Sequence, residues 1–298
     1  MKRLLTLLLL MAFQLDAAAV EPLVSPAWLE QNRGEPDLVL LDLQENQNYL
    51  RFHIPGSVNT RYSQWRVEKK GHPKVMPLVP ILEKLIGSLG IGNDSHVVLI
   101  SLGASAGDLA AAARVYWTFK VLGHDRVSIL DGGLIGYADK RIYPLQKGNH
   151  QLKPTTFKAD YRSRMNPTTQ DVKSAIDAGA LPVDNRSRAE YLGIYGGNGK
   201  ERAGSLPKAV HLNYDWLTVN GGGRLQSIDN LQRIYDSSQV PLESPQINYC
   251  HTGNRAALGW FVSHEILGNR QARLYDGSTQ EWAIEPGLPM DQQVKLRL

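Results

Sequence analysis

A strand pattern meets a helix pattern in Ile247-Asn248-Tyr249-Cys250-His251-Thr252-Gly253-Asn254-Arg255-Ala256-Ala257, which contains the one cysteine in this sequence of 298 residues. The residues before Cys250 are typical of a short strand. From Ala256 to Gly268 apolar residues recur three and four positions apart, which predicts a helix that ends at Gly268. We therefore expect the thiol to lie in a turn between a strand and a helix.

A turn of this kind favours a reactive cysteine over a merely buried one. The backbone N–H groups of such a turn point inward, and the start of a helix adds partial positive charge. Arg255 adds a full charge five residues later, and Gly253 allows the loop to curl. The alternative is a small, buried, inert residue, which free cysteine often is. The polar, glycine-containing loop favours Cys250 as a nucleophile, which acts as the thiolate.

The first 19 residues have the pattern of a secretory signal peptide. Met1-Lys2-Arg3 is basic, residues 4–15 are almost all apolar, and Ala17 and Ala19 fit the small-residue positions before a cleavage site. The apolar run is too short to span a bilayer. We expect cleavage after Ala19 and a mature chain in the periplasm or the medium, with no membrane span. A lone thiol in an oxidising compartment can be oxidised, so it is expected to be either buried or functional.

Composition limits the partners of the mature chain. The 33 Lys and Arg residues slightly outnumber the 29 Asp and Glu residues, and no basic block carries interleaved aromatic residues. This pattern argues against nucleic acid and suits small anionic substrates. The length is sufficient for two domains of ordinary size.

Short apolar runs alternate with helical patterns, which predicts an α/β fold with parallel sheets covered on both faces. Ser25 and Pro26 fit the cap and first position of a helix. Near residues 144–154 the pattern lapses into polar residues. We expect domains at residues 20–145 and 161–298 with a linker at 146–160. In the first domain we expect strands at 38–42, 96–100 and 127–130, a turn leading into a short strand over 52–59, and helices at 44–50, 80–89 and 108–122.

The second half of the sequence repeats the first. Asp184 lies 142 positions after Asp42, and Pro207 lies 152 positions after Pro55. The ten additional residues fall in the glycine-rich stretch 193–202. One α/β unit has therefore been used twice.

The first copy lacks the cysteine. At the position of the Cys250 loop it has Ser101-Leu102-Gly103-Ala104-Ser105-Ala106-Gly107-Asp108, which is longer and has no basic residue. The fold therefore does not need the cysteine, and we expect the first copy to be structural and inactive.

These features together resemble the tandem-domain rhodaneses, the thiosulfate and 3-mercaptopyruvate sulfurtransferases, of an exported bacterial type. The resemblance extends from Leu23 to Pro289. It rests on His53-Ile54-Pro55-Gly56-Ser57-Val58, Ala203-Gly204-Ser205-Leu206-Pro207-Lys208-Ala209-Val210, the turns Asp131-Gly132-Gly133 and Asp276-Gly277-Ser278, and Cys250-His251-Thr252-Gly253-Asn254-Arg255. It implies two tandem rhodanese-like domains, each a parallel sheet flanked by helices, of which the second is catalytic.

The resemblance also implies roles for individual residues. Cys250 would carry the sulfur as a persulfide, and Arg186 and Arg255 would bind the anionic donor. His53 matches a position of proton transfer in mercaptopyruvate enzymes, although its segment mainly makes a turn. Thr252 matches a second position of proton transfer. The backbone N–H groups around the transferred sulfur would come from His251, Thr252, Gly253, Asn254 and Arg255. This Cys-x-x-Gly-x-Arg loop looks more like that of single-domain rhodaneses, which leaves the donor open.

The predicted reaction moves a sulfane sulfur from thiosulfate or 3-mercaptopyruvate to cyanide or a thiol. It requires no metal or organic cofactor, and we expect a monomer. A non-catalytic module that binds sulfur or thiols is the main alternative. A cysteine-dependent phosphatase fits less well, because its loop has five residues between Cys and Arg and this loop has four. A disulfide oxidoreductase would need a Cys-x-x-Cys motif, which is absent from the sequence.

Overall fold

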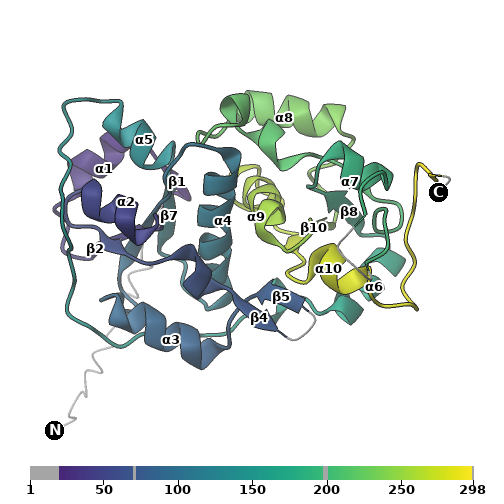
Figure 1. The fold of residues 1–298 in the computed structure, drawn as a ribbon, viewed down its shortest axis with the longest axis horizontal. Coiled ribbons are helices and arrows are strands. Elements are labelled where there is room, and N and C mark those ends of the chain that lie inside the picture. Colours follow the sequence, from purple (N-terminus) through teal and green to yellow (C-terminus); the bar gives the residue numbers. More distant parts are fainter. Residues whose placement is uncertain (1–19, 70–71, 197–200, 297–298) are drawn as a thin grey trace, which may run out of the picture.

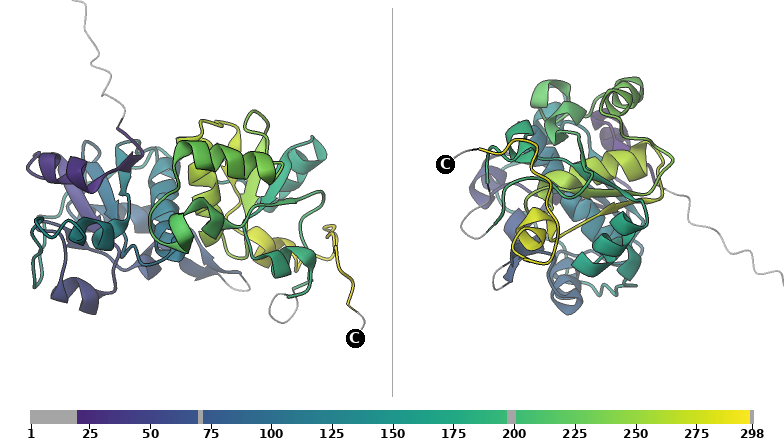
Figure 2. Two further views of the ribbon diagram at one scale, coloured as in Figure 1. Left: turned by 90° about the horizontal axis from the view of Figure 1, so that it is seen from above. Right: turned by 90° about the vertical axis from the view of Figure 1, so that its right-hand side faces the viewer.

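The computed structural model describes residues 20–69, 72–196 and 201–296. The expected signal peptide and residues 197–200 of the glycine-rich stretch lie outside these ranges. Two α/β units lie side by side, the N-terminal half (residues 20–145) and the C-terminal half (residues 161–296) (Figures 1 and 2). In the described ranges, no helix has both the length and the apolar character needed to cross a membrane.

The N-terminal half is built on a parallel five-stranded sheet in the order β1-β7-β6-β2-β3. Val39 and Leu41 pack into one hydrophobic cluster, and Leu40 between them packs into another, so both faces of the sheet are buried. The strands are β1 (Leu23–Val24), β2 (Leu38–Asp42), β3 (Val58–Asn59), β6 (His96–Ile100) and β7 (Val127–Leu130). The helices are α1 (Pro26–Asn32), α2 (Asn46–Arg51), α3 (Val79–Ser88), α4 (Ala106–Val121) and α5 (Gly133–Ala138).

The C-terminal half repeats this arrangement with a parallel sheet in the order β11-β10-β8-β9. This order matches β7-β6-β2-β3, and β2 and β8 both end at the aspartates aligned by the repeat, Asp42 and Asp184. The prediction of two α/β repeats with parallel sheets flanked by helices is confirmed. The strands are β8 (Leu181–Asp184), β9 (Val210–His211), β10 (Gln246–Tyr249) and β11 (Ala272–Leu274); the α-helices are α6 (Thr169–Asp177), α7 (Arg188–Leu192), α8 (Ile228–Ser237), α9 (Asn254–Trp260) and α10 (Ser278–Trp282).

Two local features differ from the sequence-based expectations. The helix after Cys250 becomes π-helical at η5 (Phe261–Ile266) before Gly268 ends it with a φ of 81°. An antiparallel hairpin, β4 (Val67–Lys69) and β5 (His72–Val75), follows the 3₁₀ turn η1 (Tyr62–Trp65), where no element was expected. The remaining 3₁₀ turns are η2 (Ser163–Met165), η3 (Tyr214–Leu217) and η4 (Val219–Gly221).

The two halves share one hydrophobic core. Helices α4 and α9 pack against each other between the sheets (Figure 1). Tyr116 of α4 lies edge-on to Phe261, with ring centroids 5.0 Å apart. The expected linker has no helix or strand and packs along the N-terminal half, where the Thr155 N–H donates to the Gly87 carbonyl at 2.9 Å. The halves are therefore joined by a packed interface as well as by the chain.

The aligned aspartates have different partners. Asp42 accepts hydrogen bonds from the Gln44 N–H and from Gln44 Nε2, both at 2.9 Å. Asp184 instead faces Arg186, whose Nε and Nη2 lie 2.9 and 2.6 Å from its oxygens. Burial raises the pKa of Asp42 to about 6, and the hydrogen bonds from Gln44 offset this only in part. Among the described residues, the buried carboxylate of Asp42 therefore has no cation beside it.

This difference predicts a pH-dependent effect of Asp42→Asn. The folded state binds the Asp42 proton more tightly than the unfolded state, so the wild-type free energy of unfolding falls as pH rises from 3.8 to about 6. The variant lacks this loss, and we expect it to be more stable than the wild type by up to about 3 kcal/mol at pH 7.5, with a smaller gain at pH 4.

Urea denaturation at both pH values measures the effect. The matched variant Asp184→Asn removes the compensation of a buried Arg186 charge and is expected to lose about 3–5 kcal/mol. An equal effect of Asp42→Asn at pH 4 and pH 7.5 would contradict the assignment.

Candidate active site

Cys250 lies in the predicted turn, between the end of β10 and the start of α9. Its side chain is buried, with 1% of the residue exposed. Its N–H donates to Ser278 Oγ, and its carbonyl accepts from Thr279 Oγ1, each at 3.1 Å. The turn from Asp276 to Thr279 therefore holds the cysteine backbone from behind.

Gly253 is required for the shape of this loop. Its φ is 75°, and a Cβ atom at this position would lie 2.7 Å from the Asp276 carbonyl oxygen. Any other residue would be strained and would clash with backbone. The tight contact explains how the loop returns to the helix within four residues, Cys250 to Gly253.

The loop presents backbone N–H groups that have no protein partner. Within the described ranges, the N–H groups of residues 251–255 donate no hydrogen bond to an oxygen or nitrogen of the chain. Successive unpartnered N–H groups at a turn form a concave site for an anion. This arrangement suits a thiolate or a persulfide on Cys250.

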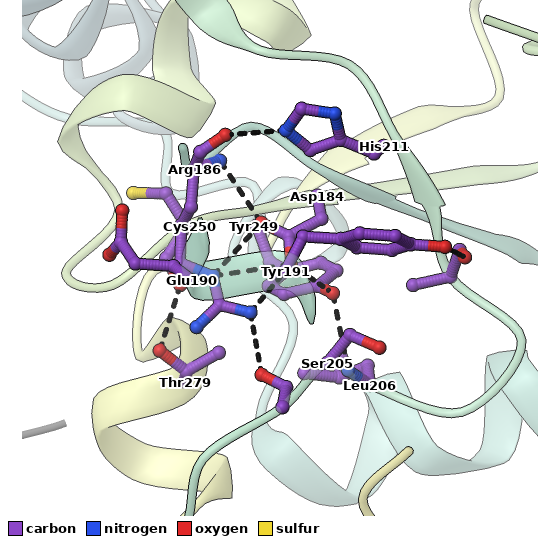
Figure 3. A network of polar contacts seen from close by, with 12 residues as sticks. Asp184, Arg186, Glu190, Tyr191, Ser205, Leu206, His211, Tyr249, Cys250 and Thr279 are labelled. Carbon is purple, nitrogen blue, oxygen red and sulfur yellow. Dashed lines mark hydrogen bonds and ion pairs between the residues drawn. The ribbon is translucent and has the colours of Figure 1, made fainter. Parts of the chain in front are cut away.

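Arg186 follows β8 and is anchored by Asp184. In addition to its hydrogen bonds to Asp184, Arg186 donates from Nη2 to the Gly204 carbonyl at 2.7 Å, while Tyr249 Oη donates to Asp184 at 2.8 Å. Burial opposes the charge of Arg186, but Asp184 outweighs it and raises the Arg186 pKa. Figure 3 shows Arg186 in the same group of residues as Cys250, whose sulfur points away from Thr279.

Arg255 is held by Glu190 at the start of α7. Its Nη1 and Nη2 lie 2.7 and 2.8 Å from the two carboxylate oxygens. Burial alone would raise the pKa of Glu190, but the hydrogen bonds and charge of Arg255 lower it to about 2. The pair is therefore ionised at neutral pH, and it fixes a cation on the residue that follows the N–H groups of the loop.

His251 and Arg186 line the same pocket, of about 240 Å³. His251 Nε2 lies 2.9 Å from Glu201 Oε2. Other lining residues are Glu190, Arg202 and Thr279. The pocket therefore combines two predicted site residues with charged groups that the sequence analysis did not single out.

Thr252 and Asn254 face the N-terminal half instead. Arg66 donates to the Thr252 carbonyl, and Tyr62 Oη donates to Asn254 Oδ1 at 2.5 Å. The sequence did not indicate Arg66 or Tyr62, because neither lies in a recognisable motif. Contacts between the sulfur donor and the predicted site residues remain predictions.

His53 lies in the N-terminal half and is fully buried. Its Nδ1 is 2.8 Å from the Tyr49 carbonyl oxygen, and its ring stacks on Tyr49. Its backbone pairs with Gln146. Within the described ranges no hydrogen bond links His53 to the Cys250 loop. The contacts of His53 agree with a role in forming its turn.

The corresponding loop of the N-terminal half is filled by its own carboxylate. Asp108 Oδ2 accepts from the N–H groups of Ala104 and Ser105 at 2.9 and 3.0 Å. This carboxylate occupies N–H groups that an external anion would need. The absence of a cysteine and this internal anion together agree with an inactive first copy.

A metal site is not evident near Cys250. Across the described part of the chain, no group of three or more His, Cys, Asp and Glu side chains is arranged to hold a metal ion.

Comparison with known proteins identifies the repeated unit. Residues 25–140 and 168–285 each match the rhodanese-like domain. A putative thiosulfate sulfurtransferase of Haloferax volcanii is 30% identical, covering 92% of this chain and 97% of that protein. Thiosulfate/3-mercaptopyruvate sulfurtransferase 1, a mitochondrial protein of Arabidopsis thaliana, is 29% identical, with 91% and 78% covered.

The fold also matches a solved structure, SseA from Escherichia coli, described as a 3-mercaptopyruvate sulfotransferase with the rhodanese fold. The TM-score is 0.74 at 24% identity, covering 87% of this chain and 99% of that chain. Because two consecutive segments match the same domain, and these segments coincide with the two α/β repeats, this chain belongs to the rhodanese-like family as a tandem-domain member.

Proposed function

We propose that this chain is a sulfurtransferase that carries sulfane sulfur on Cys250, from thiosulfate or 3-mercaptopyruvate to cyanide or a thiol. The observation that carries the proposal is the buried lone cysteine at a loop whose N–H groups have no partner in the described chain. The names of the relatives support the same reaction class. A protected nucleophile beside an anion site is what a persulfide carrier needs.

In the first half-reaction the Cys250 thiolate attacks the outer sulfur of the donor. An S–S bond to Cys250 forms, and the bond between that sulfur and the rest of the donor breaks. The leaving group departs with the bonding electron pair, as sulfite from thiosulfate or as the enolate of pyruvate from 3-mercaptopyruvate. The loop N–H groups stabilise the anionic persulfide that remains.

In the second half-reaction the acceptor attacks the outer sulfur of the persulfide. Cyanide gives thiocyanate, and a thiolate gives a new persulfide; in each case the Cys250 thiolate is the leaving group. The sulfur therefore moves without net oxidation of the enzyme, and no cofactor is needed. The two half-reactions form a ping-pong cycle.

The donor's negative charge is met by Arg186 and Arg255. Asp184 and Glu190 fix the two guanidinium groups, so little side-chain freedom is lost on binding. Arg186 Nη1 makes no hydrogen bond within the described chain, which leaves it to donate to a sulfonate or carboxylate.

We also propose that the protein is exported to the periplasm or secreted as a monomer after cleavage following Ala19. The basic start and apolar run of residues 1–19 support export. N-terminal sequencing of the mature protein should begin at Val20, and sedimentation should give the mass of one chain. A retained Met1 or a stable dimer would contradict these proposals.

One prediction of the proposed reaction concerns turnover by Cys250→Ser. Wild-type protein should form thiocyanate from thiosulfate and cyanide, or transfer sulfur from 3-mercaptopyruvate to a thiol, with parallel double-reciprocal plots. Cys250→Ser should fall to background, because a hydroxyl does not form the persulfide. An inactive but donor-binding wild type would support the binding-module alternative, and hydrolysis of p-nitrophenyl phosphate by the wild type would support a phosphatase.

Another prediction of the proposed reaction concerns donor binding by Arg186. The variant Arg186→Gln reproduces the Asp42–Gln44 pair of the N-terminal half, so the fold should tolerate it. We expect the donor KM to rise by about 10- to 100-fold, because a charge-assisted hydrogen bond is lost. Steady-state kinetics with Arg188→Ala, an exposed arginine two positions later, provides the control. Unchanged donor kinetics in Arg186→Gln would remove Arg186 from the site.

A further inference from the structure

The catalytic loop is held by two side chains from the opposite half of the molecule. Arg66 follows η1 and donates to the carbonyl of Thr252. Tyr62, at the start of η1, donates to Asn254 Oδ1 at 2.5 Å. Arg66 Nη1 also donates to Tyr62 Oη at 3.3 Å, so the two side chains act as a unit. One short segment therefore contacts both sides of Gly253.

The contact from Arg66 determines the direction of a backbone N–H. A trans peptide is planar, and its C=O and N–H point in opposite directions. With the Thr252 carbonyl turned toward Arg66, the N–H of Gly253 must point away from Arg66. This N–H belongs to the group of unpartnered donors in the Cys250 loop.

Arg66 is itself rigidly placed. Only 8% of the residue is exposed, and its Nε donates to the Lys74 carbonyl at 2.6 Å. Lys74 lies in β5, so the hairpin β4–β5 holds the Arg66 guanidinium through a backbone carbonyl. The hairpin thus helps to place Arg66 beside the Cys250 loop, which its sequence did not indicate.

A second support from the N-terminal half reaches the turn behind the loop. The Met76 N–H donates to Asp276 Oδ2 at 2.8 Å, and Arg114 donates to Asp276 Oδ1. The Asp276 backbone packs against Gly253, and Ser278 holds the Cys250 N–H. The loop and its backing are therefore both attached to the N-terminal half.

We propose that Arg66 and Tyr62 are positioning residues for sulfur transfer, and that they hold the catalytic loop so that the Gly253 N–H is directed at the transferred sulfur. This inference rests on the proposed function. The N-terminal half, whose own loop is filled by Asp108, contributes to the reaction by completing the anion site of the other half. Arg66 acts through the loop backbone and does not touch the donor.

The test is the rate at which Cys250 takes up sulfur in a single turnover. For Arg66→Ala we expect the rate constant with saturating donor to fall about 10- to 100-fold, because one donor of the anion site is misdirected. The donor KM should change by less than about threefold, because Arg186 and Arg255 still bind the donor. Arg66→Lys retains one donor for the Thr252 carbonyl and should recover part of the rate.

Two further variants complete the design. Tyr62→Phe should show a smaller fall than Arg66→Ala, since it frees the Asn254 side chain and leaves the peptide planes in place. Arg51→Ala removes an exposed arginine of the same half and should load at the wild-type rate. Counting accessible thiols and folded protein before each assay normalises the rates to folded enzyme.

The outcomes separate the two proposals. Wild-type loading rates in folded Arg66→Ala, Arg66→Lys and Tyr62→Phe would overturn the positioning role and leave the sulfurtransferase intact. A rise in donor KM with an unchanged maximal rate would also overturn it, because it would place Arg66 in donor binding. If Arg66→Ala does not fold, Arg66→Lys and Tyr62→Phe decide the matter. A wild type that takes up no sulfur would instead overturn the proposed function.

Discussion

A buried ion pair between Arg114 of α4 and Asp276 of the C-terminal half connects the fold to the chemistry. Arg114 is completely buried, and within the described chain its Nε and Nη1 atoms have no partner. Burial lowers the pKa of Arg114, and the charge of Asp276 opposes that effect. Loss of Asp276 would leave a buried charge uncompensated, which is far costlier than loss of an exposed pair. Because Asp276 also packs against Gly253, the interface between the halves and the catalytic loop depend on the same residue.

The duplication has produced two halves with the same topology and different polar contacts. At the end of the aligned strands, Asp184 is paired with Arg186, whereas Asp42 accepts a hydrogen bond from Gln44. In the following strand-to-helix turn, one half presents unpartnered N–H groups around Cys250, and the other supplies its own carboxylate, Asp108. The N-terminal half has the same topology, fills its corresponding loop with Asp108, and contacts the Cys250 loop through Arg66 and Tyr62. Residues of both halves therefore surround the Cys250 loop.

The sequence predicted the features that follow from local pattern. Buried strands and helix ends at glycine follow from short sequence patterns, and the offset of Asp184 from Asp42 reveals the repeat. The structure confirms the two parallel sheets and the position of Cys250 between a strand and a helix. Arg66, Tyr62 and Arg114 could not be found in this way. Arg66 and Thr252 are 186 residues apart, and Arg114 stands within an apolar helix where an isolated charge has no visible partner. Contacts of this kind depend on how the halves pack, which no local periodicity encodes.

The mass of the intact protein shows whether Cys250 carries sulfur. Reduced mature protein is mixed separately with thiosulfate and with 3-mercaptopyruvate. We expect a gain of about 32 Da, one sulfur atom, that cyanide or a thiol reverses and that is absent from Cys250→Ser. The donor that loads faster would identify the subtype. An unchanged mass with both donors, in folded and fully reduced protein, would contradict the account.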